Sequence, residues 1–263
     1  MKKSIVFGCL AISSLIYAEP EKKPHPCKDQ GFYIKLGSGP SFANEAEIKA
    51  PLSIWDTAAE GYNGSLGTAP IVLAGLGYDS SFVSTDITAS YRPNYNYKKY
   101  QTPTTTDTIG ELGSTTRRFT LDVASIMETI YLNGRGWRWL DWKVGHCSSI
   151  FPVIGGGVGI SQMKLSNFRS TGLSPIVGSF PSFASENQYS VQYKFTYQLM
   201  GGFEFRYKNL CGLSMGYRWF DVGQFNSSQY LRSADGTAMD IGSNPWKIKF
   251  AANELFIEFK VFL

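Results

Sequence analysis

Hydrophobic and polar side chains alternate without a break over residues 189–207. The odd positions are almost all aromatic or aliphatic, and the even positions are mostly polar, among them Lys194, Glu204 and Arg206. Because successive side chains of a β-strand point to opposite faces, a period of two gives one apolar face and one polar face. The stretch is far longer than the usual strand of about five or six residues. It predicts a membrane-spanning strand with lipid on one side and a lumen on the other.

Seven further segments show a weaker form of this alternation. With the first, they span residues 31–42, 71–78, 82–92, 118–131, 151–163, 189–207, 213–221 and 254–263. Connections 79–81 and 208–210 are short, whereas connections 43–70, 93–117, 164–188 and 222–253 are long. An even strand count, short turns at one end and long loops at the other are typical of outer-membrane barrels. The fold class predicted is all-β, an eight-stranded antiparallel up-and-down transmembrane β-barrel with long extracellular loops.

The apolar face of each predicted strand is assigned to lipid and the polar face to the lumen. For residues 118–131 this rule places outside Phe119, Leu121, Val123, Met127 and Tyr131. Arg92 is assigned to the inner face. Because buried charges need partners and eight strands leave a narrow interior, we expect a lumen ion-pair network and no open pore. The residues expected in this network are Lys35, Asp86, Arg118, Asp122, Glu128, Lys194, Glu204, Arg206, Arg218, Glu258 and Lys260.

The N-terminus predicts export. Lys2 and Lys3 precede a short apolar run over residues 5–17, which is followed by Ala18 and a polar stretch. A cationic start, a short apolar run and a small final residue are the marks of a secretory signal peptide. We expect cleavage after Ala18. The predicted organisation is a signal peptide over residues 1–18, a periplasmic N-terminal segment over 19–30 and an outer-membrane β-barrel domain over 31–263.

Composition agrees with a barrel. The chain is 15% aromatic and 17% charged and contains 27 glycines, and its mean hydropathy of -0.14 is too low for a helical membrane protein. Removal of residues 1–18 takes away Lys2 and Lys3 and no acid, so the net charge of +4 becomes +2. That charge is no signature of nucleic-acid binding.

Cysteines and histidines gather at the predicted periplasmic end. The mature chain keeps Cys27, Cys147 and Cys211, and its histidines are His25 and His146. Because the periplasm is oxidising, we expect a disulfide between Cys147 and Cys211, the alternative being three reduced thiols. The cysteine spacings match no compact zinc pattern. On the extracellular side, no histidine stands with a serine or a carboxylate to act as a base. The sequence predicts no enzyme, no catalytic or metal residues and no cofactor.

Three tryptophans occupy the connection between the fourth and fifth predicted strands. Trp137, Trp139 and Trp142 lie in a turn of some eighteen residues, which is long for the periplasmic side. Two interpretations stand side by side: a membrane-interface anchor, which tryptophan favours, and a short amphipathic helix that caps the barrel.

The glycine run at residues 155–159 suggests a phosphate-binding loop at first sight. No Gly-Lys-Ser or Gly-Lys-Thr follows it, and no helical pattern begins after it. Glycines in a barrel strand more often permit curvature and close packing, and we adopt this structural interpretation.

An aromatic and basic run after the third predicted strand is a candidate contact surface. Its residues are Tyr95, Tyr97, Lys98, Lys99 and Tyr100. They are suited to acidic surface sugars or to a host ligand. The interpretation we favour is an aromatic girdle that merges into a solvated loop.

Four segments resemble a known family. Residues 213–223, LSMGYRWFDVG, resemble the seventh-strand motif of the opacity-type, OmpA-like outer-membrane β-barrel surface proteins of Gram-negative bacteria. Residues 131–134, 151–159 and 195–206 resemble the fourth turn, the fifth strand and the sixth strand of that family. One departure is the final Leu263, because the family commonly ends in an aromatic residue.

The resemblance implies a bacterial outer-membrane location and a non-enzymatic role that is structural, adhesive or host-interacting through the loops. The expected partners are outer-membrane lipids and lipopolysaccharide, the barrel assembly machinery and a host surface ligand, with no nucleic acid. The alternative function is a narrow channel or transporter for small apolar or amphipathic molecules, against which the inward charges argue.

Overall fold

The structure is a computed structural model, and the parts of the chain that it describes are residues 30–44, 48–49, 66–101, 115–145, 147–174, 178–185, 189–208, 210–226, 230–232, 238–240 and 247–263. The predicted signal peptide, residues 19–29, His25 and His146 lie outside these residues. Within the described ranges, no helix has the length and apolar character needed to cross a membrane.

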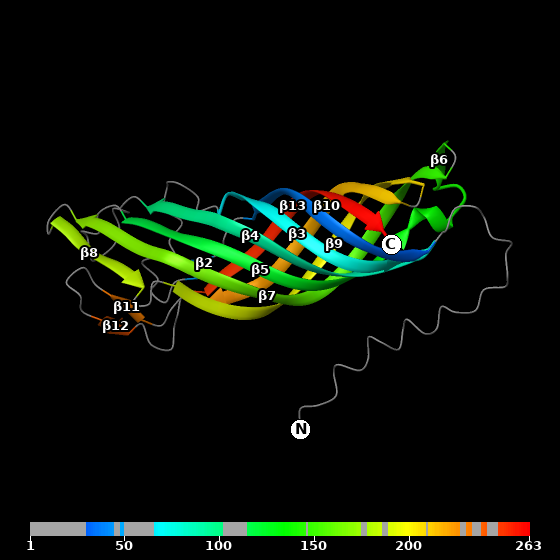
Figure 1. Cartoon of the computed structure of the whole chain (residues 1–263). Helices are drawn as coiled ribbons and strands as arrows, with labels where there is room; N and C mark the ends of the chain where they lie inside the picture. The colour runs from blue at the N-terminus through cyan, green and yellow to red at the C-terminus, as the bar shows by residue number, and fades with distance from the viewer. Residues whose placement is uncertain are drawn as a thin grey trace, which may run out of the picture.

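Eight long strands of the described chain form the wall of a closed barrel (Figure 1). They are β1 Gly31–Ala43, β3 Thr68–Asp79, β4 Val83–Gln101, β5 Thr115–Asn133, β7 Ser148–Ser174, β9 Tyr189–Tyr207, β10 Cys211–Asn226 and β13 Lys247–Phe262. Every neighbouring pair is antiparallel, and the pairings of β7 with β9 and of β1 with β13 complete the ring. The predicted fold class is confirmed.

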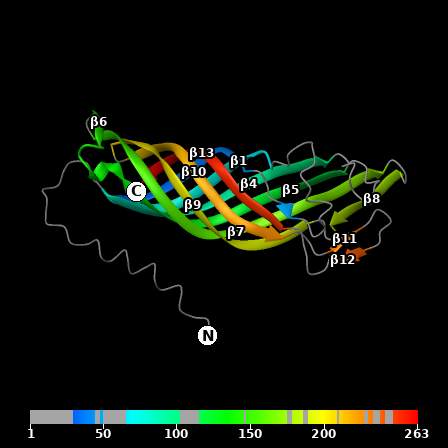
Figure 2. The ribbon, with the colours of Figure 1, turned by 180° about the vertical axis from the view of Figure 1, so that it is seen from behind.

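Shorter elements sit at the two ends of the wall. They are β2 Ile48–Lys49, the 3-10 helix η2 Gly134–Gly136, β6 Trp142–Gly145, β8 Gly178–Ser185, β11 Tyr230–Arg232 and β12 Ala238–Asp240. We call the turn end the end that holds the C-terminus and β6, and the loop end the end that holds β8, β11 and β12. The two ends lie at opposite extremes of an elongated molecule (Figures 1 and 2).

Bulges explain why the strands are longer than their alternation predicts. In β4 the register shifts between Arg92 and Tyr95, around Asn94, whose φ is 60°. Arg92 and Tyr95 are both buried in the interior, so inward positions change from even to odd. A bulge adds one residue to a strand and breaks the period of two, but pairing continues beyond it. Residues 93–101 therefore belong to β4, and their prediction as loop is wrong.

The same device extends β10, where the register shifts between Asp221 and Gly223, whose φ is 73°. Glycine adopts this left-handed conformation without the steric cost that a Cβ brings. Parts of the predicted loops 164–188 and 222–253 are likewise strand, in β7, β8, β10, β11, β12 and the start of β13.

The glycine run of β7 makes room for large side chains of β5. Gly155, Gly157 and Gly159 pair with Tyr131, Thr129 and Met127, respectively. A Cβ on Gly155 would lie 2.7 Å from the Tyr131 ring, and one on Gly159 would lie 2.7 Å from the Met127 sulfur. The interpretation of this run as a close-packing device is confirmed.

Candidate functional site: the filled lumen and the outer belt

Ten charged side chains fill the lumen from the turn end to the bulge of β4. We call them the lumen ion network: Lys35, Asp79, Asp86, Arg92, Glu204, Arg206, Arg218, Glu254, Glu258 and Lys260. None of them is more than 3% exposed. Five are cations and five are anions, so the network is neutral as a whole. Neutrality matters here, because an unpaired charge in a dry interior is strongly destabilising.

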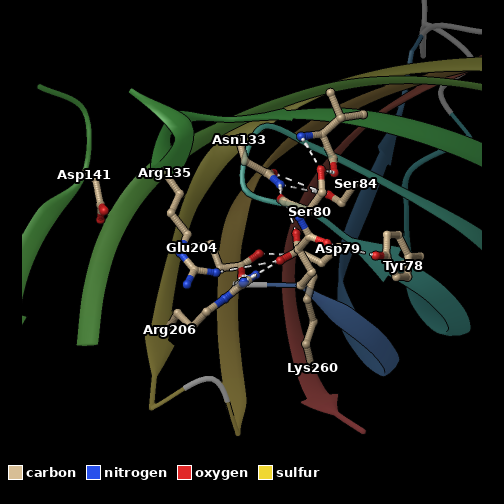
Figure 3. Close-up of polar contacts among 12 residues, drawn as sticks. Tyr78, Asp79, Ser80, Ser84, Asn133, Arg135, Asp141, Glu204, Arg206 and Lys260 are labelled. Atoms are coloured by element: carbon tan, nitrogen blue, oxygen red, sulfur yellow. Dashed lines mark hydrogen bonds and ion pairs between the residues drawn. The ribbon is translucent and has the colours of Figure 1, made fainter. Parts of the chain in front are cut away.

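The part of the network nearest the turn end centres on Arg206 (Figure 3). Its guanidinium donates to Asp79 and, at 2.6 Å, to Glu204. Lys260 donates to the other oxygen of Glu204, also at 2.6 Å. Asn133 donates to Asp79 at 3.0 Å and fixes that carboxylate from the β5 side. Strands β3, β5, β9 and β13 are thus joined across the interior.

The middle part centres on Lys35. Its ammonium lies 2.7 Å from Asp86 and 3.6 Å from Glu258, and it donates to the Tyr131 hydroxyl at 2.9 Å. Asp86 also accepts a hydrogen bond from Tyr33 at 3.0 Å. The carboxylate and the ammonium therefore have several partners each, as buried charges require.

The part nearest the bulge centres on Glu254, which accepts from Arg92 at 2.5 Å and from Ser41 at 2.7 Å. Arg218 links this part to the middle, since it lies 2.6 Å from Glu258 and 3.5 Å from Glu254. The Arg92 guanidinium stacks 3.7 Å from the centre of the Phe220 ring. At this depth, the filling of the lumen changes from charged to aromatic.

Beyond Arg92 the lumen is filled by a hydrophobic cluster that we call the apolar layer. Its buried members are Leu66, Ala69, Tyr95, Tyr97, Phe119, Leu121, Val123, Met127, Met163, Leu165, Phe220, Val222, Phe225, Ile248, Phe250 and Ala252. Tyr97 stacks on Phe119 with ring centres 4.6 Å apart, and Tyr95 meets Phe250 edge to face at 5.0 Å. Side chains thus fill the barrel on both sides of the bulge.

The structure brings together seven of the eleven residues predicted for the lumen. They are Lys35, Asp86, Glu204, Arg206, Arg218, Glu258 and Lys260. Lys194 is half-buried on the inward side of β9. Sequence reasoning left three members out of the network: Asp79, which it assigned to a turn, Arg92 and Glu254. The sequence pattern could have identified Glu254, because it lies on the same face of its strand as Glu258 and Lys260, at an even-numbered position.

The predicted faces of β5 are wrong. Phe119, Leu121, Val123, Met127 and Tyr131 are 2% exposed or less and point into the lumen. Arg118 and Glu128 are exposed on the outside, and Asp122 is half-buried, where it accepts from the Asn94 backbone N–H at 2.8 Å. Alternation fixes which residues share a face, but it does not say which face meets the lumen. Here the inner face is the more apolar one, because much of it belongs to the apolar layer.

The aromatic and basic run predicted as a contact surface does not lie on one face of the barrel. Tyr95 and Tyr97 are buried in the apolar layer, and the Tyr95 hydroxyl shares a hydrogen bond with Ser41. Their assignment to a contact loop is wrong, since the bulge turns them inward. Lys98 is exposed on the outer face. Lys99 and Tyr100 lie in β4, but their side chains are outside the described residues.

The predicted Cys147–Cys211 disulfide is wrong. Cys211 is a free thiol, and Cys147 is disulfide-bonded. The reason lies in the strand order. Cys147 precedes β7 and Cys211 begins β10, and β9 lies between these strands. Two strand spacings are about 9.5 Å, which exceeds the roughly 7 Å limit between the Cα atoms of a disulfide.

The tryptophan connection does not form the predicted amphipathic helix, since its described residues form η2 and β6. Trp137, Trp139 and Trp142 are all exposed. Trp142 stacks on the outward ring of Phe203 at 6.1 Å. Exposed indoles at the turn end suit the interface-anchor interpretation.

The outside of the barrel carries a continuous apolar surface, which we call the outer belt. It comprises exposed side chains of all eight strands: Phe32, Ile34 and Leu36; Val72 and Leu76; Ile87 and Tyr91; Ile126, Ile130 and Leu132; Ile154, Val158 and Ile160; Tyr193, Phe195, Tyr197, Leu199, Phe203 and Phe205; Leu213, Met215 and Tyr217; Leu255, Ile257, Phe259 and Val261. A soluble monomer rarely exposes a continuous apolar patch larger than a few hundred Å².

Basic residues follow the belt toward the loop end. Lys98 of β4 pairs with Arg118 of β5, and we call these two residues the basic row. Lys98 and Arg118 are exposed. Like charges directly opposite one another on a sheet are unfavourable, so this basic row is suited to an anionic partner.

Among the described residues, no group of three or more His, Cys, Asp or Glu side chains is placed to hold a metal ion. A cavity of about 10 Å³ in the wall is lined by Tyr131, Met200, Phe256, Glu258 and Lys260, among others. That volume holds a single water molecule at most. The site is therefore a filled barrel interior with an apolar exterior.

Solved structures are the known proteins to which this chain is similar. No family model and no curated protein matches the chain. Among solved structures it is similar to Neisserial surface protein A, with 14% identity, a TM-score of 0.42 and coverage of 90% of this chain and 100% of that chain. It is also similar to the outer membrane protein OprG from Pseudomonas aeruginosa, with 10% identity, a TM-score of 0.49 and coverage of 90% and 99%.

A third similar structure is Ail, the attachment invasion locus protein of Yersinia pestis, in complex with the heparin analogue sucrose octasulfate. The identity is 10%, the TM-score is 0.29, and the match covers 88% of this chain and 99% of that chain. The assignment of the present chain to the closed eight-stranded antiparallel barrels rests on its own strand pairing.

Proposed function

We propose that this chain is a non-enzymatic surface protein of the bacterial outer membrane, in which the barrel anchors the connections at the loop end. The single observation that carries the proposal is the outer belt. Exposed aliphatic and aromatic side chains cover all eight strands, while the ten charged side chains of the lumen ion network are turned inward. Lipid is the medium in which an apolar exterior and a closed ring of strands are both favourable.

The finer assignment is to the opacity-type, OmpA-like surface proteins, with a structural, adhesive or host-interacting role for the loops. Export by residues 1–18, insertion by the barrel assembly machinery and binding of a host ligand belong to the same proposal. It is supported by the sequence motifs of the fifth, sixth and seventh long strands. The narrow transporter is the weaker candidate: the apolar layer suits an apolar molecule, but its side chains are packed against one another and leave no described passage.

Lipopolysaccharide is the partner that the basic row favours. Arg118 lies ten residues above Glu128 on β5, which is about 33 Å along the strand. A strand tilt of about 40° reduces this to about 25 Å along the membrane normal, roughly 12 Å beyond the edge of a belt about 25 Å tall. Anionic sugar-phosphate groups of a glycolipid would meet Lys98 and Arg118 at that height.

Gel mobility and bilayer recordings test the proposal. Folded barrels in detergent migrate faster than their boiled form, and we expect this difference for the full chain. We expect no steady conductance of porin size in a planar bilayer, because the lumen ion network and the apolar layer fill the interior. A steady porin-like current would favour the channel alternative.

Cell binding separates the adhesive role from a purely structural one. Cells that express the full chain would be compared with cells whose connection 227–246 is replaced by a short Gly-Ser linker. We expect loss of binding to host matrix with unchanged gel mobility, because the contacts lie in the loops and the anchor lies in the strands. Unchanged binding after replacement of this and of the other long connections would contradict the adhesive role.

A further inference from the structure

One carboxylate stands on the outside of the barrel at the middle of the outer belt. Glu128 lies on β5, and its side chain is exposed. Its neighbours along the strand on the same face are Ile126 and Ile130, and its cross-strand neighbours are Ile87 and Val158. All four are exposed belt residues. Glu128 is therefore surrounded by the most apolar part of the surface.

The depth of Glu128 follows from its position between the ends of the belt. Leu132 is the last outward belt residue toward the turn end, and Ala124 is the last one before the half-buried Asp122 on the loop side. Each is four residues from Glu128, about 13 Å along the strand. A barrel belt is about 25 Å tall, so the carboxylate lies near mid-depth.

Glu128 has no partner within the part of the chain that the structure describes. It makes no hydrogen bond and no ion pair there, in contrast to every carboxylate of the lumen ion network. Among the outward positions described between the two ends of the belt, it is the one charged side chain. An ionisable group at this depth in lipid is unfavourable unless another group pairs with it.

The surface around Glu128 differs from the rest of the belt in shape. Its diagonal neighbours on β4 are Thr85 and Ala89, and one of its diagonal neighbours on β7 is Gly156. These side chains are small, so the carboxylate projects further from the sheet than its diagonal neighbours do. Small residues allow the backbone of another membrane-embedded chain to approach closely. The strand that borders this face, β9, pairs with β7 and presents large rings such as Tyr193 and Phe195.

We propose that the β4–β5–β7 face around Glu128 is a docking surface for another membrane-embedded protein chain that carries a lysine or arginine side chain at mid-depth. Charge complementarity selects this occupant. A second copy of the chain fits less well, because a symmetric contact would set Glu128 against Glu128, and the described belt has no cation to offer. The inference rests on the proposed function, since it requires that the belt lie in lipid.

The test uses the full chain folded into phosphatidylcholine vesicles, with a fluorescent donor on the free thiol of Cys211. The probe is a synthetic transmembrane helix of leucine and alanine with one central lysine and an acceptor dye. The matched control peptide has leucine at that position. The barrels compared are the wild type and Glu128→Gln, which keeps the shape of the side chain and removes its charge.

We expect the lysine peptide to associate about tenfold more tightly with the wild type than with Glu128→Gln, and the leucine peptide to show no such difference. Equal association of the lysine peptide with both barrels would overturn the inference. A Glu128-dependent dimer of the barrel without peptide would also overturn it, because the surface would then belong to a second copy.

A separate measurement distinguishes this outcome from failure of the proposed function. Protease protection and heat-dependent gel mobility report whether the wild type is inserted in the vesicles. A wild type that does not insert contradicts the proposed function. An inserted barrel that does not discriminate between the peptides leaves the proposed function standing and overturns only the docking surface.

Discussion

The two halves of the lumen are filled by opposite chemistry. Toward the turn end, ten buried charges form a neutral network, whereas beyond Arg92 the same strands enclose aromatic and aliphatic side chains. Four strands, β3, β4, β10 and β13, contribute to both halves. The boundary coincides with the bulges of β4 and β10, where inward positions change parity. A bulge therefore lets one strand supply charge at one depth and hydrocarbon at another.

The comparison teaches how each half depends on its partners. In the ion network most charges are held by two or more opposite or polar groups, so the loss of one group leaves others without a partner. In the apolar layer each contact is weak and non-directional, so a substitution removes mainly the contacts of the atoms deleted.

The largest expected effect is the removal of one charge from the ion network. Glu204→Gln leaves Arg206 and Lys260 with reduced compensation in the interior. We expect the free energy of unfolding to fall by about 3–5 kcal/mol, as for other broken buried pairs. Guanidinium unfolding in lipid vesicles measures it. The matched control is Glu128→Gln, which makes the same chemical change on the outer face, removes an unpaired charge from lipid and should not lower the free energy of unfolding. Equal effects at the two positions would contradict the network.

A slightly smaller effect is expected in the apolar layer. Leu121 is fully buried there, and Leu121→Ala deletes atoms that the rigid wall cannot replace. We expect a loss of about 2–4 kcal/mol in the same assay. The comparison with Ile126→Ala, five residues away on the outer belt, sharpens the point. Ile126→Ala leaves no internal cavity and should lower the free energy of unfolding by less. Equal losses for the two variants would mean that Leu121 does not contribute as a core residue.

A third prediction concerns the glycines of β7, which let this strand pack closely against β5. A Cβ on Gly159 would lie 2.1 Å from the Ile126 carbonyl oxygen, whereas one on Gly156, which faces outward, would lie 3.5 Å from Leu199. We expect Gly159→Ala to cost about 1–3 kcal/mol through overpacking. Gly156→Ala should be close to neutral in the same unfolding measurement. A reversed order would mean that the wall between β5 and β7 is not closely packed.

The smallest expected effect is at the free thiol. Cys211 lies at the turn end outside the ion network, and it is half-buried. Alkylation of the folded barrel should therefore proceed without reductant and leave gel mobility unchanged. Peptide mapping would identify the modified residue. If alkylation required prior reduction, Cys211 would not be a free thiol. That result would support the Cys147–Cys211 disulfide, which the strand order argues against.

Alternation along the sequence was sufficient for much of the fold. It placed β9 at its observed limits, Tyr189 and Tyr207, and it gave eight antiparallel strands with short turns at one end. The reason is that period two is a property of the extended backbone itself and needs no partner. The same property grouped Lys35, Glu258 and Lys260 on the inner side of their strands.

Three features depended on the tertiary structure. Which face of β5 meets the lumen was settled by the strands that pair with it on either side, namely by the glycines of β7 and the aromatic rings of β4. The inward turn of Tyr95 was settled by a bulge, which only pairing with a neighbouring strand defines. The separation of Cys147 from Cys211 was settled by the closure of β7 on β9. The sequence by itself determined the strands and the residues that share each face, because those are local. Only the closed barrel decided which face is inside and which side chains meet, because those depend on strands far apart in the chain.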